Sequence, residues 1–208
     1  MKQLVKNIGF KLKKWFIVYP KAYSGSILWP LTLVSRQAKF KQMANTTTQF
    51  LARGWVLDVG TGPGFLPIEI AKNSPNVHVV GVDIALELLN DGIKRAKDKR
   101  LDDRISFLRA NTESLPFEND TFDMVLSMFS LHLWSNRQLG ISEMCRVLKP
   151  GGEILILVGR SYLLHGLAIV TDYFTRRSIS YIRKMCFNAG FKEVEIKGVR
   201  ELHIMAKK

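Results

Sequence analysis

Short apolar runs alternate with amphipathic segments along the chain from about residue 53 onward. The apolar runs are rich in Val, Ile and Phe, as buried β-strands are, and the segments between them repeat apolar residues at helical spacing. We therefore expect strands at residues 55–59, 77–82, 104–109, 122–127 and 153–158, and helices at residues 65–72, 85–100 and 136–148. Strands separated by helices of this length predict βαβ crossovers, and hence a mostly parallel sheet with helices on both faces.

The C-terminal end of the chain has a different pattern. A helix is expected at residues 179–189, ended by Gly190, and two strands follow at residues 191–199 and 201–206. Because parallel strands need a long crossover, two strands with almost no connection between them can only form an antiparallel hairpin. The predicted fold class is α/β, with a seven-stranded, mostly parallel sheet that ends in an antiparallel C-terminal hairpin.

The composition fits one globular domain with a sizeable core, since the chain has 208 residues, of which 47% are hydrophobic and 24% charged. Its two cysteines, Cys145 and Cys186, both fall in predicted helices, so we expect neither a disulfide framework nor a metal site, and a cytoplasmic location is the default. The stretch nearest to a membrane span, residues 15–35, is interrupted by lysine and proline, so no transmembrane helix is expected. No secretory signal is expected either.

Positive charge is concentrated in the N-terminal quarter. The chain has 31 Lys and Arg residues and 18 Asp and Glu residues, which give a formal net charge of +13. Residues 1–57 contain ten of the basic residues and no acidic residue, and the other 151 residues hold 21 basic and 18 acidic residues. Nine of the 21 aromatic residues also lie in this quarter, and a helical pattern runs from Arg36 to Ala52. These features predict a basic, aromatic, helical cap over residues 1–52.

Residues 1–17 have the pattern of a basic amphipathic helix, with apolar residues on one side of the helical wheel and Lys2, Lys6 and Lys13 pointing away from it. A helix of this kind is typical of a segment that lies on an anionic membrane surface. The alternative is a helix that packs on its own domain and exposes its lysine face to solvent. The pattern therefore leaves peripheral membrane contact as one of two interpretations.

A glycine-rich turn follows the first predicted strand, at residues 58–64, and leads directly into a helix. Its Gly-x-Gly-x-Gly spacing places glycines where the backbone must turn sharply and approach a ligand closely. A dinucleotide fingerprint would require a small residue at position 65, where this chain has Phe65, and a P-loop would require a lysine that does not follow. The turn therefore favours neither NAD nor ATP.

Two acidic residues accompany this turn. Asp58 ends the first strand, and Asp83 ends the second strand, where a carboxylate can accept hydrogen bonds from both ribose hydroxyls. An acidic residue at the end of the first strand would repel a phosphate and favour a cation. The expected ligand is a nucleoside that carries positive charge and no phosphate. Alternatively, Asp83 caps the helix that follows it and the glycines only form a tight turn.

Four segments in order, residues 56–64, 79–83, 111–117 and 146–152, resemble the motifs of class I S-adenosylmethionine-dependent methyltransferases, most closely those of the small-molecule and quinone-biosynthesis type. The resemblance implies a Rossmann-like fold, with residues 53–208 as the S-adenosylmethionine-binding methyltransferase domain and residues 1–52 as a cap within the same domain. It also implies that the product is S-adenosylhomocysteine. The cofactor-binding residues that it implies are Asp58, Gly60, Thr61, Gly62, Gly64, Asp83, Ile84, Leu88, Asn111, Thr112 and Ser127.

The resemblance also implies a role for several of these residues. Asp58 would lie near the ammonium group of the cofactor, Asp83 would hold the ribose, and Asn111 would meet the adenine amino group. The third motif departs from the common Gly-Asp-Ala-Glu pattern, since it contains Asn111, but the side-chain carbonyl of Asn can still accept a hydrogen bond from the adenine amine.

The acceptor is expected at the carboxyl ends of the strands, where ligands bind in open α/β sheets. His132, which follows the fourth strand, is the candidate catalytic base or acceptor contact; its alternative is a histidine that bonds within the fold and shapes the site. Tyr19, Tyr23 and His165 are weaker candidates. The apolar segments at residues 162–171 and 19–34 suggest a hydrophobic or lipid-like acceptor, unless they only pack on each other.

Three functions remain open from these residues. The first is methyl transfer to a small hydrophobic or lipid-like acceptor. The second is RNA or protein methylation with the basic N-terminal arm, although residues 127–130 lack the Asn/Asp-Pro-Pro-Tyr/Phe motif of enzymes that methylate base amino groups. The third is a non-catalytic protein that keeps the cofactor fold.

Overall fold

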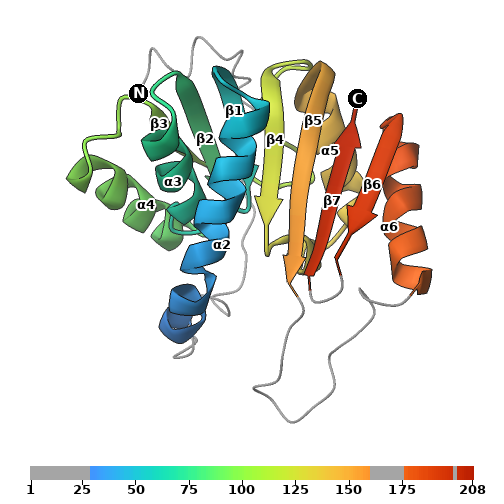
Figure 1. Ribbon diagram of the computed structural model, residues 1–208, viewed down its shortest axis with the longest axis horizontal. Coiled ribbons are helices and arrows are strands. Elements are labelled where there is room, and N and C mark those ends of the chain that lie inside the picture. Colours follow the sequence, from blue (N-terminus) through green and yellow to red (C-terminus); the bar gives the residue numbers. More distant parts are fainter. Residues whose placement is uncertain (1–28, 160–175, 199–200) are drawn as a thin grey trace.

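The computed structural model describes residues 29–159, 176–198 and 201–208 (Figure 1). The predicted helix at residues 1–17, the apolar segment at residues 162–171 and most of the one at residues 19–34 lie outside the described residues, as do the candidate site residues Tyr19, Tyr23 and His165. The position of these candidates therefore stays a prediction.

The described strands form one seven-stranded sheet in the order β3-β2-β1-β4-β5-β7-β6. Strand β7 pairs antiparallel with both of its neighbours, and the other pairs are parallel, which confirms the predicted mostly parallel sheet and its C-terminal hairpin. The bounds are β1 Gly54–Val59, β2 Val77–Asp83, β3 Ile105–Arg109, β4 Phe122–Met128, β5 Leu148–Gly159, β6 Glu193–Lys197 and β7 Glu201–Lys207.

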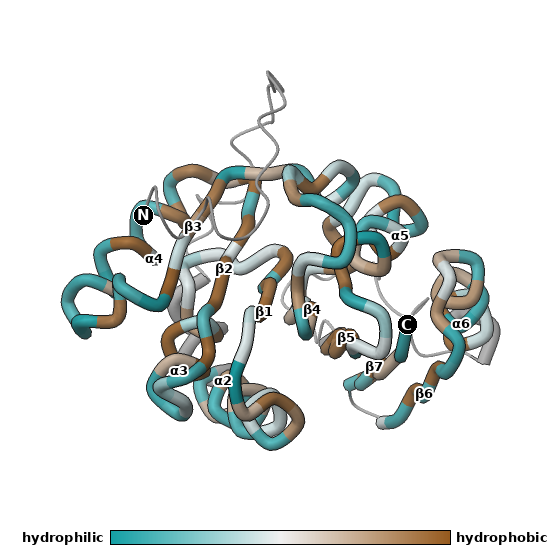
Figure 2. Tube along the Cα trace, turned by 90° about the horizontal axis from the view of Figure 1, so that it is seen from above, coloured by the Kyte–Doolittle hydropathy of each residue, from teal (hydrophilic) through white to brown (hydrophobic). Residues whose placement is uncertain are grey.

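Helices cover both faces of the sheet, as predicted. One face carries α2, α3 and α4, and the other carries α5 and α6 (Figures 1 and 2). The bounds are α2 Trp29–Phe50, α3 Phe65–Asn73, α4 Leu86–Asp98, the 3-10 turn η1 Leu131–Leu133, α5 Arg137–Val147 and α6 Arg176–Ala189. In the described part of the chain, none of the helices combines the length and the apolar character needed to cross a membrane.

Each face of the central strands contributes to a different part of the core. Leu57 and Val59 of β1 face α5 and α6, whereas Val56 faces α2 and α3. Side chains alternate between the two sides of a strand, so a parallel sheet covered on both faces requires strands that are apolar at nearly every position. This requirement explains why the strands were visible in the sequence as apolar runs. Cys145 and Cys186 are both buried and free, in helices α5 and α6.

Two elements differ from the prediction at their starts. Strand β5 begins at Leu148, so the expected turn at residues 149–152 is part of the strand. Gly151 has a positive φ of 77°, and the segment is held by pairing with the end of the chain, where Lys208 N–H donates to the Gly152 carbonyl at 3.1 Å. Helix α2 begins at Trp29 rather than Arg36, because Pro30 stands in the first turn, where a missing N–H costs nothing.

Candidate functional site

The predicted ligand-binding residues meet at the carboxyl edge of the sheet, the lower edge of β4 and β5 in Figure 1. The strand order reverses beside β1, which lies between β2 and β4. In open α/β sheets ligands bind at such a switch point, outside the carboxyl ends of the strands. The glycine turn after β1 lies at this point.

The three glycines of the turn have different tasks. All three have positive φ, 76° at Gly60, 54° at Gly62 and 74° at Gly64. A Cβ atom on Gly60 would lie 2.4 Å from the Ser130 Cβ, and one on Gly64 would lie 2.5 Å from the Phe107 ring, so both positions are closed by packing. A Cβ on Gly62 would meet nothing within 4 Å. Gly62 is therefore the position where the backbone of the turn is open to a ligand.

Phe65, whose size argued against a dinucleotide, packs against the neighbouring helices. Its ring stacks on Phe40 of α2 with centroids 5.6 Å apart, and the Arg95 guanidinium of α4 lies 4.6 Å from its centroid. The bulky residue therefore ties α2 and α4 to the start of α3, and it leaves no small-residue surface at the position where a dinucleotide fold uses one.

Asp58 is buried, with 2% of its surface exposed. Its Oδ2 accepts a hydrogen bond of 2.7 Å from the Thr61 hydroxyl, and its Oδ1 is buried without a hydrogen bond from any described residue. Burial raises the pKa of Asp58 from 3.8 to about 7; the Thr61 hydrogen bond opposes this shift, and the negative charge of Asp83 adds to it. A buried carboxylate oxygen without a partner is costly unless a ligand satisfies it, and a cation does so best.

Asp83 is partly buried and binds the turn directly. Its Oδ2 accepts from Gly62 N–H at 2.8 Å, and its Oδ1 accepts from Ala85 N–H at 2.9 Å. Burial raises the pKa of Asp83, and these backbone hydrogen bonds oppose the shift. The capping interpretation and the ligand-binding interpretation are thus compatible, since each carboxylate oxygen keeps a second lone pair that can accept from a ribose hydroxyl.

The residues expected near the adenine lie at the ends of β2 and β3. Ile84, Leu88 and Thr112 are all partly buried. Asn111 is also partly buried, and its Oδ1 accepts from Glu113 N–H at 3.0 Å in a local turn. The second lone pair of this oxygen can still accept from an adenine amine, and the amide nitrogen is a donor.

Ser127, expected at the cofactor site, supports the segment after β4, and its contact with a cofactor stays a prediction. Its side chain is fully buried. Its Oγ lies 2.6 Å from the Ser130 Oγ, and the Ser130 hydroxyl donates to the Val59 carbonyl at 3.1 Å. Through Ser130, Ser127 therefore helps to hold the segment after β4 against the end of β1.

Two residues of this region were missed from the sequence. Ser130 closes the space beside Gly60, and Phe129 has a positive φ of 56° that is unusual for an aromatic residue. Phe129 is held in this conformation by its N–H, which donates to the Leu157 carbonyl at 2.8 Å, and by edge-to-face packing on Phe40 with centroids 6.5 Å apart. No pattern in the sequence marks a non-glycine residue of this kind.

His132 lies in η1 at the same edge of the sheet, and its side chain is exposed. It follows Ser130 by two residues, so it is close in the chain to the segment that packs on Gly60. His132 therefore lies at the edge where an acceptor is expected, and its role stays a prediction.

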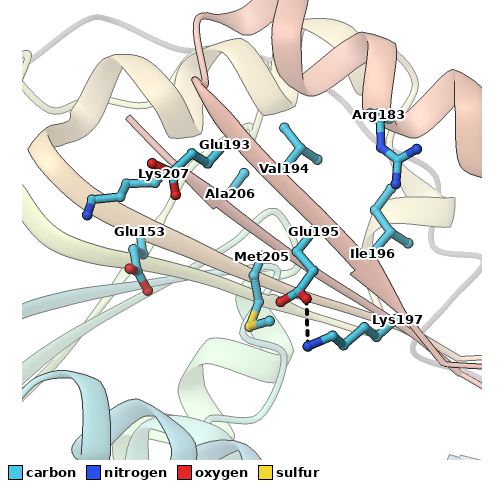
Figure 3. A pocket seen from close by; sticks show the side chains of 10 residues that line it. All are labelled: Glu153, Arg183, Glu193, Val194, Glu195, Ile196, Lys197, Met205, Ala206 and Lys207. Carbon is cyan, nitrogen blue, oxygen red and sulfur yellow. Dashed lines mark ion pairs between the residues drawn. The ribbon is translucent and has the colours of Figure 1, made fainter.

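Two hollows of the described part of the protein lie away from this edge. One of about 450 Å³ surrounds the edge strand β6, where Glu195 and Lys197 form an ion pair of 2.6 Å beside Met205 (Figure 3). Another of about 300 Å³ lies near the amino ends of β4 and β5, between Phe50 and the Gly151 segment. Neither hollow contains the glycine turn or its two acidic residues, so the site is assigned from the turn and not from the size of a hollow.

The fold and the arrangement of the site are similar to those of class I S-adenosylmethionine-dependent methyltransferase domains. Residues 56–152 match the family model described as a methyltransferase domain. A Porphyromonas gingivalis protein named demethylmenaquinone methyltransferase is 40% identical over 119 residues, which cover 57% of this chain and 49% of that protein. A Geobacter protein named ubiquinone/menaquinone biosynthesis C-methyltransferase UbiE is 41% identical over 105 residues, 50% of this chain and 45% of that protein. The chain spans about half the length of these curated relatives.

A solved structure from Methanococcus maripaludis has the same fold. That protein, provisionally described as an S-adenosylmethionine-dependent methyltransferase, superposes with a TM-score of 0.75 and covers 94% of this chain and 97% of its own. Its sequence identity is 20%, so the similarity is one of fold.

The buried carboxyl of Asp58 predicts a pH dependence of stability without ligand. Folding raises the pKa of Asp58 from 3.8 to about 7. The contribution of the protonated carboxyl to the free energy of unfolding is therefore fully present below about pH 4, and it is lost as the pH rises through 7. The ionised group then costs roughly 4 kcal/mol. We expect the melting temperature of wild type relative to Asp58→Asn to fall between pH 4 and pH 8, as measured by differential scanning fluorimetry. A difference that stays constant over this range would contradict the analysis.

Proposed function

We propose that the protein binds S-adenosylmethionine at the carboxyl edge of the sheet and transfers its methyl group to a small, hydrophobic acceptor of the quinone type. The observation that carries the proposal is the buried Asp58 Oδ1, which lacks a partner among the described residues next to an open Gly62. An acidic residue buried in this way beside a second carboxylate favours a cationic ligand over a phosphate.

The residues of the site fit each part of this cofactor. Asp58 would bind the ammonium group, the open Gly62 backbone would let the methionine part pass, and Asp83 would accept hydrogen bonds from the ribose. Ile84 and Leu88 would pack near the adenine, and Asn111 would accept from its amino group. Thr61 holds the Asp58 carboxylate in place with its hydroxyl at 2.7 Å.

When bound, S-adenosylmethionine supplies a methyl group on a sulfonium that is already activated toward a nucleophile. The task of the chain is then to orient the two reactants and exclude water, and such positioning supplies ~7–11 kcal/mol of a barrier. Gly60 and Gly64 fix the turn through close packing, and the Ser127–Ser130 pair fixes the facing segment after β4. A base is required only for an acceptor that must lose a proton.

The proposed acceptor class draws on two independent supports. The curated relatives are named for demethylmenaquinone and for ubiquinone and menaquinone biosynthesis. The sequence has apolar segments at residues 19–34 and 162–171, which are expected to contribute to the acceptor site. Both favour a hydrophobic ring compound over a nucleic acid, whose recognition would use basic and stacking residues at the site.

The basic N-terminal quarter favours a second candidate, methylation of RNA or protein.

We also propose a cytoplasmic protein, with peripheral membrane contact through residues 1–17 as the alternative to their packing on the domain. Residues 1–52 would act as a cap; in support, α2 packs on the same face of the sheet as α3 through Met43 and Ala44. A non-catalytic protein would keep the cofactor site and give no methylated product.

Asp83→Ala should weaken the binding of S-adenosylhomocysteine by at least about 10–100-fold, because the loss of even one hydrogen bond to a charged group costs ~1.5–3 kcal/mol. Asp91→Ala is the matched control, since Asp91 is an exposed acidic residue of α4. Isothermal titration calorimetry of both variants and wild type measures the effect. Equal affinities for all three proteins would rule out the assigned cofactor site.

The acceptor class is tested by transfer of a labelled methyl group. The full chain is incubated with methyl-labelled S-adenosylmethionine and separate quinone, lipid, RNA and protein fractions. We expect label in the quinone fraction and its loss with Asp83→Ala. Label in RNA or protein instead would support the second candidate, and retained cofactor with no labelled fraction would support the non-catalytic protein.

His132 is proposed as the base or acceptor contact. If it accepts a proton from the acceptor, His132→Asn should lower kcat by about 10²-fold or more and leave the affinity for S-adenosylhomocysteine unchanged. The exposed neighbour Leu133 provides the control variant Leu133→Ala. A His132→Asn enzyme with wild-type kcat across the pH range would remove His132 from the reaction.

A further inference from the structure

The layer formed by η1, α5 and α6 exposes an unusual number of large apolar side chains. The exposed fractions are 47% for Leu133, 47% for Leu139, 58% for Tyr181 and 49% for Phe187. Only two other large apolar side chains of the described residues are comparably exposed, Phe50 and Leu86. The apolar surface of the described part of the protein is therefore concentrated on one layer.

Helices α5 and α6 lie side by side in this layer. The Gln138 side-chain amide of α5 donates to the Met185 carbonyl of α6 at 3.1 Å. The inward side chains of both helices, such as Ile141 and Ile182, pack in one core cluster. The exposed residues are therefore not part of the core, and they belong to one continuous helical layer.

The same layer is basic. Among the described side chains of α6, Arg183 and Lys184 are exposed and basic, and the helix contains no acidic residue. The acidic residue of α5, Glu143, is engaged within the fold, where it pairs with Arg146 at 2.6 Å and accepts from Leu115 N–H at 2.6 Å. Glu193 and Glu195 of β6 line one hollow together with Arg183, so the positive charge of the layer lies on the outward side of α6, where Lys184 is exposed. A surface that combines basic, aromatic and aliphatic side chains is complementary to an anionic, apolar partner.

We propose that the η1–α5–α6 layer docks on an anionic lipid surface, with Tyr181, Phe187, Leu133 and Leu139 entering the headgroup region and Arg183 and Lys184 facing the lipid phosphates. Aromatic and leucine side chains flanked by Lys and Arg are the features by which helices lie in a membrane interface. Two exposed leucines serve a lipid surface and contribute little to binding of RNA phosphates, so a membrane is favoured over a nucleic acid.

This docking surface reaches the site described above. Leu133 belongs to η1, which begins one residue after Ser130, and Ser130 packs on Gly60 of the glycine turn. Docking of this layer would place the carboxyl edge next to the lipid, from which an apolar acceptor could enter. The inference goes beyond the proposed function and does not require it, because binding to lipid is measured without methyl transfer.

The test is sedimentation of the full chain with vesicles of phosphatidylcholine, alone or with about one third phosphatidylglycerol. Tyr181→Ser/Phe187→Ser and Leu133→Ser/Leu139→Ser should each lower the partition coefficient on the anionic vesicles by about tenfold. Arg183→Gln/Lys184→Gln should lower it on the anionic vesicles and leave the weak binding to neutral vesicles unchanged. Phe50→Ser is the matched control, since Phe50 is 57% exposed at the other edge of the sheet, and it should bind as wild type does.

All variants keep residues 1–17, so any lipid binding by that segment is common to them. Thermal unfolding that matches wild type establishes that the substitutions leave the fold intact. Partition coefficients within twofold of wild type for all three double variants would overturn the proposal, as would an equal loss with Phe50→Ser. If the double variants lose affinity for RNA and keep their affinity for vesicles, the surface is assigned to nucleic-acid binding instead. Methyl transfer to a detergent-dispersed acceptor, unchanged in Tyr181→Ser/Phe187→Ser, separates this outcome from a failure of the proposed function.

Discussion

Two carboxylates at neighbouring strand ends are held by one short turn, and the rest of the site depends on that arrangement. The Thr61 hydroxyl binds Asp58, and Gly62 N–H binds Asp83, so the same few residues position both acidic groups. Burial raises the pKa of both of them, which means that negative charge is costly at these positions in the protein without ligand. A ligand with positive charge removes this cost, whereas a phosphate would increase it. The selectivity for a cationic nucleoside therefore follows from electrostatics that are present before any ligand binds.

The turn keeps its shape because its surroundings leave it no alternative. Side chains from β3 and from the segment after β4 fill the space beside Gly64 and Gly60, so a larger residue at either position would have to displace the Phe107 ring or Ser130. Phe129, in its left-handed conformation, brings Ser130 to this place, and its ring packs against Phe40 of α2. The aromatic contacts of Phe40 with Phe65 and Phe129 thereby connect α2 to the two segments that border the glycine turn. Rigid packing of this kind is what positions reactants in an enzyme that has little covalent chemistry to perform.

The sequence was sufficient for the sheet, the helices and the position of the two acidic residues, because parallel strands buried on both faces must be apolar throughout. The same reasoning could not find Ser130 or Phe129, since a close approach between segments about 70 residues apart leaves no periodic pattern. Nor could it show that Ser127 is fully buried and bonded to Ser130, because that contact depends on how the segment after β4 folds back. The 149–152 segment was predicted as a turn from its Pro and Gly content, and pairing with the C-terminal residue Lys208 overrides that preference.

The distribution of acidic residues gives the protein two ends with different electrostatic properties. Residues 83–123 hold ten of the 18 acidic residues and seven basic residues, a balance of −3, and cover the end of β2, α4, β3 and the start of β4. Strand β3 forms one end of the sheet, and α6 lies with β6 and β7 at the other (Figure 1). The acidic residues near β3 and the basic residues of α6 therefore lie at opposite ends, and an anionic surface would orient the molecule with α6 toward it. Because the cofactor site lies at the reversal of strand order between these ends, such an orientation leaves the β2–β3 side exposed to water for entry of a polar cofactor. The side next to η1 and α5 would then receive the apolar acceptor, so that the two reactants approach the turn from different phases.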